Sequence, residues 1–414
     1  MVAPAADYLP QPAVDAGVDE DRRRRFPAGA ALDFADLEEH GRIPVLDALR
    51  AREPVTWAPV FGGWLVTSHA LARDVLMRRD DFTVWSEANL VRASLGVMML
   101  TSDGEFHDRQ RSPFEPPFHM RAVRERFERP IAARVDALLD ELAPRGDGDL
   151  SIDFALPFAI GVAADVLGLS LDDVPKIGGF YDAFAGAMVY DGDPEPQRRA
   201  DVVRAELDTI LLSEIERVRA HPDGSVTAAV ANDPACGLDD AGIAAQLRVI
   251  LFGAIETVQS MVLNTLLLLL QHPEQLAALR ADSSLLPNGL EEALRLIPPV
   301  AFIERWARHD TPLGEVTVPA GEFVGVSVVA ANRDPATFAD PGRFDIRREN
   351  ARRHLGFSFG VHHCLGFNIA RLQGAVALAA LLDRLQGLRL VEAPEPAGFA
   401  FRKPARLVLA WDAY

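Results

Sequence analysis

Cysteine occurs at only two positions in this chain, and one of them stands among glycines and histidines. Cys364 lies in the segment GFSFGVHHCLGFNIA, directly before a run with helical spacing. A thiolate needs groups that stabilise its negative charge, which backbone N–H groups and the start of a helix both provide. With no second cysteine nearby, a local disulfide or a structural zinc site is excluded. A single thiolate suits haem iron, whose in-plane ligands come from the porphyrin, whereas the alternative is an inert buried cysteine in a glycine-rich turn.

Composition and charge narrow the class of protein. The chain has 414 residues, 49% hydrophobic and 25% charged, and a net charge of −18, which is typical of a globular protein without a nucleic-acid partner. The longest apolar run, 261–270, is far shorter than the roughly 20 residues of a membrane span, and no signal peptide is evident at the first residues. Two distant cysteines fit a reducing compartment. We therefore predict a cytoplasmic protein with no membrane segment.

Helical spacing dominates the chain, and β signals occur in two places. We expect helices at residues 69–79, 121–142, 200–220, 242–271, 273–281, 290–297 and 365–385. Alternating residues around glycine-containing turns predict strands within 54–68 and within 314–335. Neither β piece is long enough to be independent, so we expect residues 31–414 to form one domain. The segment 1–30, rich in proline, alanine and charge, is expected to be loosely ordered.

Two neighbouring polar residues interrupt the apolar middle of the longest predicted helix. Glu256 and Thr257 stand in LFGAIETVQSM, where a buried carboxylate without a partner would be unfavourable. A hydroxyl recharged by a neighbouring carboxylate is able to pass protons to a bound reactant. The alternative is that Glu256 faces water or forms a salt bridge while Thr257 bonds back to a helical carbonyl. These residues alone leave both interpretations open.

Charged pairs at helical spacing mark two further segments. Glu292 and Arg295 are three positions apart, which permits a charge-assisted pair on one helix face. His107 and Arg111, four positions apart, also face the same way on a helix. Taken singly, each pair is equally typical of an exposed helix. A basic run at residues 347–353 precedes the cysteine segment and, on its own, indicates a solvated loop.

The cysteine segment resembles a known motif. FSFGVHHCLG is similar to the haem-binding loop of the cytochrome P-450 family at every specified position, namely Phe357, Gly360, His362, Cys364 and Gly366. The resemblance extends over roughly residues 55–410. It implies the fold of that family, mainly α with a small β region, in which a long central helix crosses over the haem and the β sheets are split. It also implies haem b as the cofactor, with Cys364 as the axial ligand of its iron.

Other motifs follow in the order that this family has. The segment around Glu256 and Thr257 resembles the family's oxygen-activation motif, which implies that these two side chains relay protons to iron-bound dioxygen. The glycine usual in this motif is replaced by Ala254, whose methyl group would narrow the space beside the iron. The resemblance implies four partners for the haem propionates, namely His107, Arg111, Arg305 and His362. It implies a structural cluster of Glu292, Arg295 and Arg348, with Arg343 competing for the last place.

The function implied is that of a haem-thiolate monooxygenase. Such an enzyme inserts one atom of O2 into an organic substrate, here expected to be a hydrophobic small molecule, such as a secondary metabolite. No Gly-x-Gly-x-x-Gly fingerprint follows a predicted strand, so the electrons are expected from a separate donor. The basic run 347–353 would attract an acidic ferredoxin by charge. Oxidative coupling, desaturation, peroxygenase chemistry on the same scaffold, and a non-catalytic haem sensor are the alternatives.

The substrate pocket is indicated only in outline. Positions that resemble substrate contacts are Ile255, Val258, Val300, Phe302 and Phe399. Apolar side chains in those places favour a hydrophobic ligand. Each of them is equally compatible with simple core packing.

Overall fold

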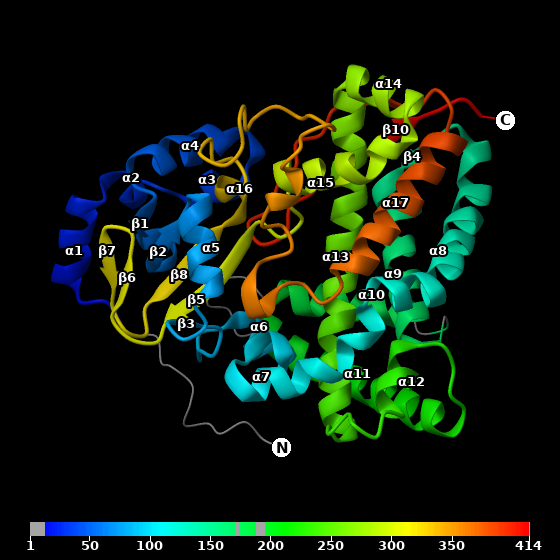
Figure 1. Cartoon of the computed structure of the whole chain (residues 1–414), viewed down its shortest axis with the longest axis horizontal. Coiled ribbons are helices and arrows are strands. Elements are labelled where there is room, and N and C mark those ends of the chain that lie inside the picture. The colour runs from blue at the N-terminus through cyan, green and yellow to red at the C-terminus, as the bar shows by residue number, and fades with distance from the viewer. Residues whose placement is uncertain (1–12, 171, 173, 188–194, 414) are drawn as a thin grey trace.

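Helices make up most of the computed structural model; the strands of its largest sheet gather on one side, and β4 and β10 lie on the other side among the helices (Figure 1). The structure describes residues 13–170, 172, 174–187 and 195–413. The longer helices are α8 (Met120–Leu142), α9 (Leu156–Leu167), α10 (Val174–Gly186), α11 (Glu195–Ala220), α13 (Asp240–Gln271), α15 (Leu286–Leu296) and α17 (Phe367–Arg384). The shorter ones are α1 (Ala16–Arg25), α2 (Pro27–Ala30), α3 (Phe34–Glu38), α4 (Ile43–Arg52), α5 (His69–Met77), α6 (Leu90–Leu95), α7 (Gly104–Arg111), α12 (Val226–Ala231), α14 (Pro273–Ala281) and α16 (Val328–Ala331).

Helix α13 runs through the middle of the helical part, with α9, α11 and α17 packed against it, and α8 packs on the far side of α17 (Figure 1). The Asp239 carboxylate caps its first turn by accepting from the Gly242 N–H at 2.8 Å, and Pro273 follows its end. By length and composition α13 is able to cross a membrane, the single such helix in the described part of the chain. Other elements, however, bury 61% of its most apolar window. A helix that packs on most sides in a protein core has the same apolar composition, so this composition alone does not indicate a membrane segment.

The β region joins strands from distant parts of the chain. The largest sheet has the order β1-β2-β8-β5-β3, and smaller ones have the orders β4-β10-β9 and β6-β7. The strands are β1 (Val55–Ala58), β2 (Gly63–Val66), β3 (Phe82–Thr83), β4 (Asp147–Asp149), β5 (Phe302–Ala307), β6 (Thr311–Leu313), β7 (Val316–Val318), β8 (Phe323–Ser327), β9 (Arg389–Leu390) and β10 (Val408–Ala410). Strand β2 pairs with β8 in parallel, with Leu65 opposite Gly325. Two segments far apart in the sequence thus meet in one sheet.

The observed elements match most of the expected ones. Each predicted helix is present within a few residues of its expected bounds, and β1, β2, β7 and β8 lie in the two predicted β segments. The second segment is not β throughout, since Val328–Ala331 forms the short helix α16, capped by the Ser327 side chain. Strands β3, β4, β5, β6, β9 and β10 were not predicted. Most of them are only two or three residues long, so local alternation carries little signal for them.

The N-terminal segment departs from the expectation where the structure describes it. Residues 16–30 form α1 and α2, and the rest of the predicted loose segment, residues 1–12, lies outside the described residues. The Arg22 guanidinium lies over the rings of Trp57 and Trp64, at 4.5 and 5.2 Å from their centroids. It also pairs with Glu322 at 2.9 Å. These contacts bind α1 to the sheet and explain its order.

A buried charge cluster fixes the loop before the cysteine segment to α15. Arg295 donates two hydrogen bonds to the carboxylate of Glu292, at 2.7 and 2.8 Å, and both side chains are fully buried. Arg348 donates to the same carboxylate at 2.9 Å, whereas the exposed Arg343 contributes only its backbone carbonyl to the cluster. The remaining donors of Arg295 reach the carbonyls of Asn332 and Pro341. The cluster therefore joins three chain segments through fully paired charges.

Replacement of Arg295 tests the structural importance of this cluster. The substitution Arg295→Met leaves a buried carboxylate short of its main partner, so we expect the free energy of unfolding to fall by about 3–5 kcal/mol. Urea unfolding followed by circular dichroism measures the change. Arg343→Met is the matched control, and its expected effect is below about 0.5 kcal/mol because that side chain is exposed. Equal stability of the two variants would contradict a structural role for the pair.

Candidate active site

The cysteine loop, residues 354–366, is folded tightly upon itself. The Cys364 N–H donates to the Phe357 carbonyl at 2.9 Å, and the Ser358 N–H donates to the Leu355 carbonyl at 2.8 Å. Gly360 has a φ of 73°, and a Cβ there would lie 2.3 Å from the Leu76 carbonyl oxygen. Glycine is therefore required at position 360. Helix α17 begins three residues after Cys364, with Gly366 as its N-cap residue.

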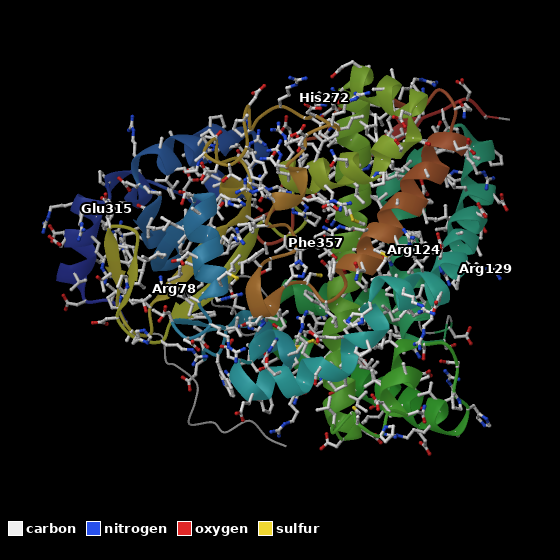
Figure 2. The ribbon with its side chains drawn as sticks, in the orientation of Figure 1. Arg78, Arg124, Arg129, His272, Glu315 and Phe357 are labelled. Atoms are coloured by element: carbon white, nitrogen blue, oxygen red, sulfur yellow. The ribbon has the colours of Figure 1, made fainter. Side chains whose placement is uncertain are left out.

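A cavity of about 410 Å³ separates this loop from α13. Cys364, Phe357 and Gly366 lie in its wall on one side, and Ala254 and Thr257 lie in its wall on the other. Phe357 is near the centre of the molecule, between the β region and α17 (Figure 2). The second cysteine, Cys236, is buried in the core and is not part of this wall. The structure thus brings the single candidate ligand and the candidate hydroxyl to one cavity.

The surroundings of Cys364 fit a cation at sulfur. Burial raises the pKa of this thiol, although the Gly366 N–H that donates to sulfur and the charges of Arg111 and Arg371 act in the opposite direction. A thiol with a raised pKa becomes a thiolate when a metal ion binds it, because the metal replaces the proton. One thiolate in a large cavity fits a cofactor that brings its remaining ligands with it.

Two histidines and an arginine gather beside the cavity. The His107 and His362 rings are in contact, with centroids 4.6 Å apart, and His107 Nε2 is buried without a hydrogen-bond partner. Arg305 is buried, donates to the Glu304 carbonyl at 2.7 Å, and forms no ion pair within the described part of the chain. Burial lowers the pKa of Arg305 to about 10. The guanidinium of Arg305 fits a ligand that carries carboxylates, as a haem does with its propionates.

Two of the four predicted propionate partners are partly engaged elsewhere. Arg111 lines the cavity but donates to Glu115 at 2.9 Å and to the His363 carbonyl at 2.8 Å. His362 Nε2 lies 3.0 Å from the carboxylate of Asp103, and burial lowers the pKa of His362 to about 4. His107 touches His362 but is not part of the cavity wall. Arg305 and His362 are therefore the two that combine a place on the wall with burial.

One face of α13 forms the wall opposite Cys364. Ala254, Thr257, Val258 and Met261 line the cavity, and their spacing of three and four places them on one helical stripe. Thr257 Oγ1 donates to the Gly253 carbonyl, one turn earlier. Ile255 lies off this stripe and is buried in the core, so its assignment as a substrate contact is wrong.

Glu256 also points away from the cavity. Its carboxylate pairs with the ammonium of Lys403 and accepts a hydrogen bond from the Tyr181 hydroxyl. Burial and the negative charge of Glu256 raise the pKa of that hydroxyl. The arrangement agrees with the alternative weighed from the sequence, a salt bridge at 256 and a bond from Thr257 to a helical carbonyl. The structure therefore does not bring Glu256 and Thr257 together at the cavity.

The substrate side of the cavity is mostly apolar. Val258, Val300, Phe302 and Phe399 line it as the sequence indicated. Further lining residues that sequence reasoning missed are Val84, Leu90, Val91, Met99, Leu100, Val249, Ile250, Phe252 and Phe401. Several of them belong to the segment around α6, where the apolar residues Leu90 and Val91 were the available signal.

Comparison with known proteins agrees with this geometry. Residues 226–395 match the family model described as Cytochrome P450. The chain is 34% identical over 375 residues to the 20-oxo-5-O-mycaminosyltylactone 23-monooxygenase of Streptomyces fradiae, which covers 88% of this chain and 86% of that one. It is 33% identical over 363 residues to the 6-deoxyerythronolide B hydroxylase of Saccharopolyspora erythraea, with 83% and 88% covered.

Solved structures give the same result. P450BioI, in complex with an acyl carrier protein that carries hexadec-9Z-enoic acid, superimposes with a TM-score of 0.83 at 27% identity. The match covers 89% of this chain and 98% of that one. CalO2 superimposes with a TM-score of 0.81 at 29% identity, over 96% and 98% of the two chains. The chain therefore belongs to the cytochrome P450 family and is a monooxygenase of the bacterial type.

Proposed function

We propose that this enzyme inserts one oxygen atom from O2 into a hydrophobic secondary metabolite, with Cys364 as the axial ligand of haem b. The observation that carries the proposal is the placement of Cys364 and Thr257 on facing walls of one apolar cavity. When bound, a haem-thiolate group supplies the activation of dioxygen, and the thiolate favours O–O cleavage. The two relatives whose names specify the oxidation of tylactone and erythronolide compounds support a substrate of that general class.

The protein's own side chains then have separate tasks. Arg305 holds the carboxylates of the cofactor by charge and hydrogen bonds. His362, with His107 in contact behind it, lies beside Arg305 and is itself held by Asp103. The apolar wall around Phe302 and Phe399 binds the substrate and keeps water away from it. The Thr257 hydroxyl, which donates to the Gly253 carbonyl, is the proton-handling group nearest the reacting atoms. In this proposal Glu256, once released from Lys403, takes up a proton from solvent and passes it to the Thr257 hydroxyl as that hydroxyl gives up its own.

Replacement of the ligand tests the haem assignment. Cys364→Ser removes the thiolate, so we expect the reduced carbon monoxide complex to lose its strongly red-shifted Soret band. Absorption spectra of the dithionite-reduced, carbon monoxide-treated protein measure this. Cys236→Ser is the control, because Cys236 is buried in the core away from the cavity. If the red-shifted band survives in Cys364→Ser, the ligand is another residue.

Replacement of the hydroxyl tests proton delivery. Thr257→Ala should bind haem and substrate as the parent does but divert electrons, so product formed per electron pair should fall about tenfold or more. The comparison of NAD(P)H consumed with product formed gives this ratio. Thr265→Ala is the matched control on the same helix, since Thr265 makes the same type of bond, to the Met261 carbonyl at 2.7 Å, away from the cavity. Equal coupling in Thr257→Ala and in the parent would remove the relay role.

We further propose an acidic ferredoxin as the electron donor and the cytoplasm as the location. The exposed side chains of Arg73, Arg352 and Arg353 flank the cysteine loop: Arg73 lies over the Phe359 ring at 4.3 Å, and the Arg353 carbonyl contacts His69. Positive charge at this face opposes the net charge of −18 on the whole chain. It would therefore steer an acidic partner to the side nearest the thiolate.

Charge reversal at this face tests the docking. Arg352→Glu with Arg353→Glu should slow reduction of the haem by a ferredoxin about tenfold at low ionic strength, and added salt should diminish the difference. Stopped-flow absorption measures the rate. Arg198→Glu, an exposed position on α11, is the control for net charge. Rates that change equally in both variants, or in neither, would contradict docking at 352 and 353.

A further inference from the structure

A turn near the C-terminus forms part of the cavity and also holds Glu256. We call residues 397–403 the C-terminal turn. Backbone hydrogen bonds of 3.1 and 3.2 Å between Ala397 and Lys403 close it. Phe399 and Phe401, inside the turn, line the cavity, whereas Lys403 at its end lies outside the cavity wall. One short segment therefore touches both the ligand space and the acid on α13.

Two adjacent side-chain contacts join the C-terminal turn to α13. The rings of Phe401 and Phe252 have centroids 5.9 Å apart. Lys403 forms its ion pair with Glu256. On the helix, positions 252 and 256 are one turn apart and share a face, and in the extended turn positions 401 and 403 also share a face. The two contacts are therefore neighbours, the aromatic one on the cavity wall and the ionic one just beyond it.

The ion pair between Glu256 and Lys403 is partly shielded from water, which strengthens the attraction between the two charges. Glu256 is 8% exposed and Lys403 is 22% exposed, so neither charge is fully screened by water. Tyr181 reinforces the site, because its hydroxyl binds Glu256 and its ring stacks on Phe252 with centroids 5.5 Å apart. We call Glu256, Lys403 and Tyr181 the clasp.

The rest of the turn is anchored to other elements. The Arg402 N–H donates to the Pro299 carbonyl at 2.9 Å, and its guanidinium donates to the Glu38 carbonyl at 2.9 Å. Asn264, two turns along α13 from Glu256, donates to the Arg402 carbonyl at 2.8 Å. These bonds hold one end of the contact between the turn and α13. The clasp closes the other end, at the edge of the cavity.

We propose that the clasp limits the size of the ligand admitted between α13 and the C-terminal turn and couples that size to the release of Glu256. The proposal rests on the proposed function. A ligand that parts Phe401 from Phe252 must also lengthen the neighbouring ion pair. Small ligands leave the clasp closed, with Glu256 turned from the cavity, whereas larger ones open it and free this carboxylate beside Thr257. Lys403 is thus a positioning residue that determines specificity.

Binding of two azoles to the haem-loaded enzyme tests the clasp. Imidazole and 4-phenylimidazole offer the same nitrogen to iron, but only the second carries a phenyl ring that fills more of the cavity, whose wall includes Phe401. In the parent, part of the binding free energy of a large ligand is spent on breaking the ion pair between Lys403 and Glu256. Lys403→Met lacks this ion pair, so the larger azole should bind it about fivefold tighter than the parent. The Kd of imidazole should not change. Titrations followed by the Soret shift give both constants.

Further variants make the result specific. Arg406→Met removes a different ion pair of the same segment, with Asp149, and should leave both constants unchanged. Glu256→Gln, and the double variant with Lys403→Met, should bind the larger azole as tightly as Lys403→Met does; the double variant leaves no unpaired charge in case the single one fails to fold. Unchanged or weaker binding of 4-phenylimidazole in these variants would overturn the clasp. Absence of any Soret shift with imidazole in the parent would contradict the proposed haem site, and the clasp with it.

Discussion

The stabilisation of one negative charge on sulfur is the constraint on which the rest of the structure depends. Cys364 is enclosed, and burial raises the pKa of its thiol. The loop opposes this with the Gly366 N–H, while Arg111 and Arg371 contribute positive charge. In the proposed function, iron bound at sulfur would complete the compensation. The tight backbone at Gly360 and the buried cluster at Glu292 both hold the loop in the position where this balance is possible.

On helix α13, Thr257 and Glu256 lie on different faces. Thr257 faces the cavity, and Glu256 is held on the neighbouring face by Lys403. An acid beside an apolar cavity would be unfavourable if it remained unpaired, and the pairing with Lys403 removes this penalty. The same pairing withholds the acid from the site until something releases it. The architecture therefore suits an enzyme in which substrate occupancy precedes proton delivery.

The sequence predicted local features well and long-range contacts poorly. The motif around Cys364 is contiguous, so its loop could be predicted residue by residue, and helical periodicity located α13 and α17. The same periodicity separates Ala254, Thr257 and Val258 from Ile255, although the motif alone had grouped them. The partner of Glu256 could not be predicted, because Lys403 lies 147 residues away in the chain and carries no local pattern. The short strands β3 and β5 were missed because their pairing is equally remote.

The central claim is the bond between the sulfur of Cys364 and a haem iron. X-ray absorption at the iron edge of the haem-loaded protein tests it most directly, because the fine structure distinguishes sulfur from nitrogen and oxygen among the nearest atoms. The account predicts one sulfur at bonding distance together with the four porphyrin nitrogens, and loss of that sulfur in Cys364→Ser. A first shell of nitrogen and oxygen alone in the parent protein would contradict it.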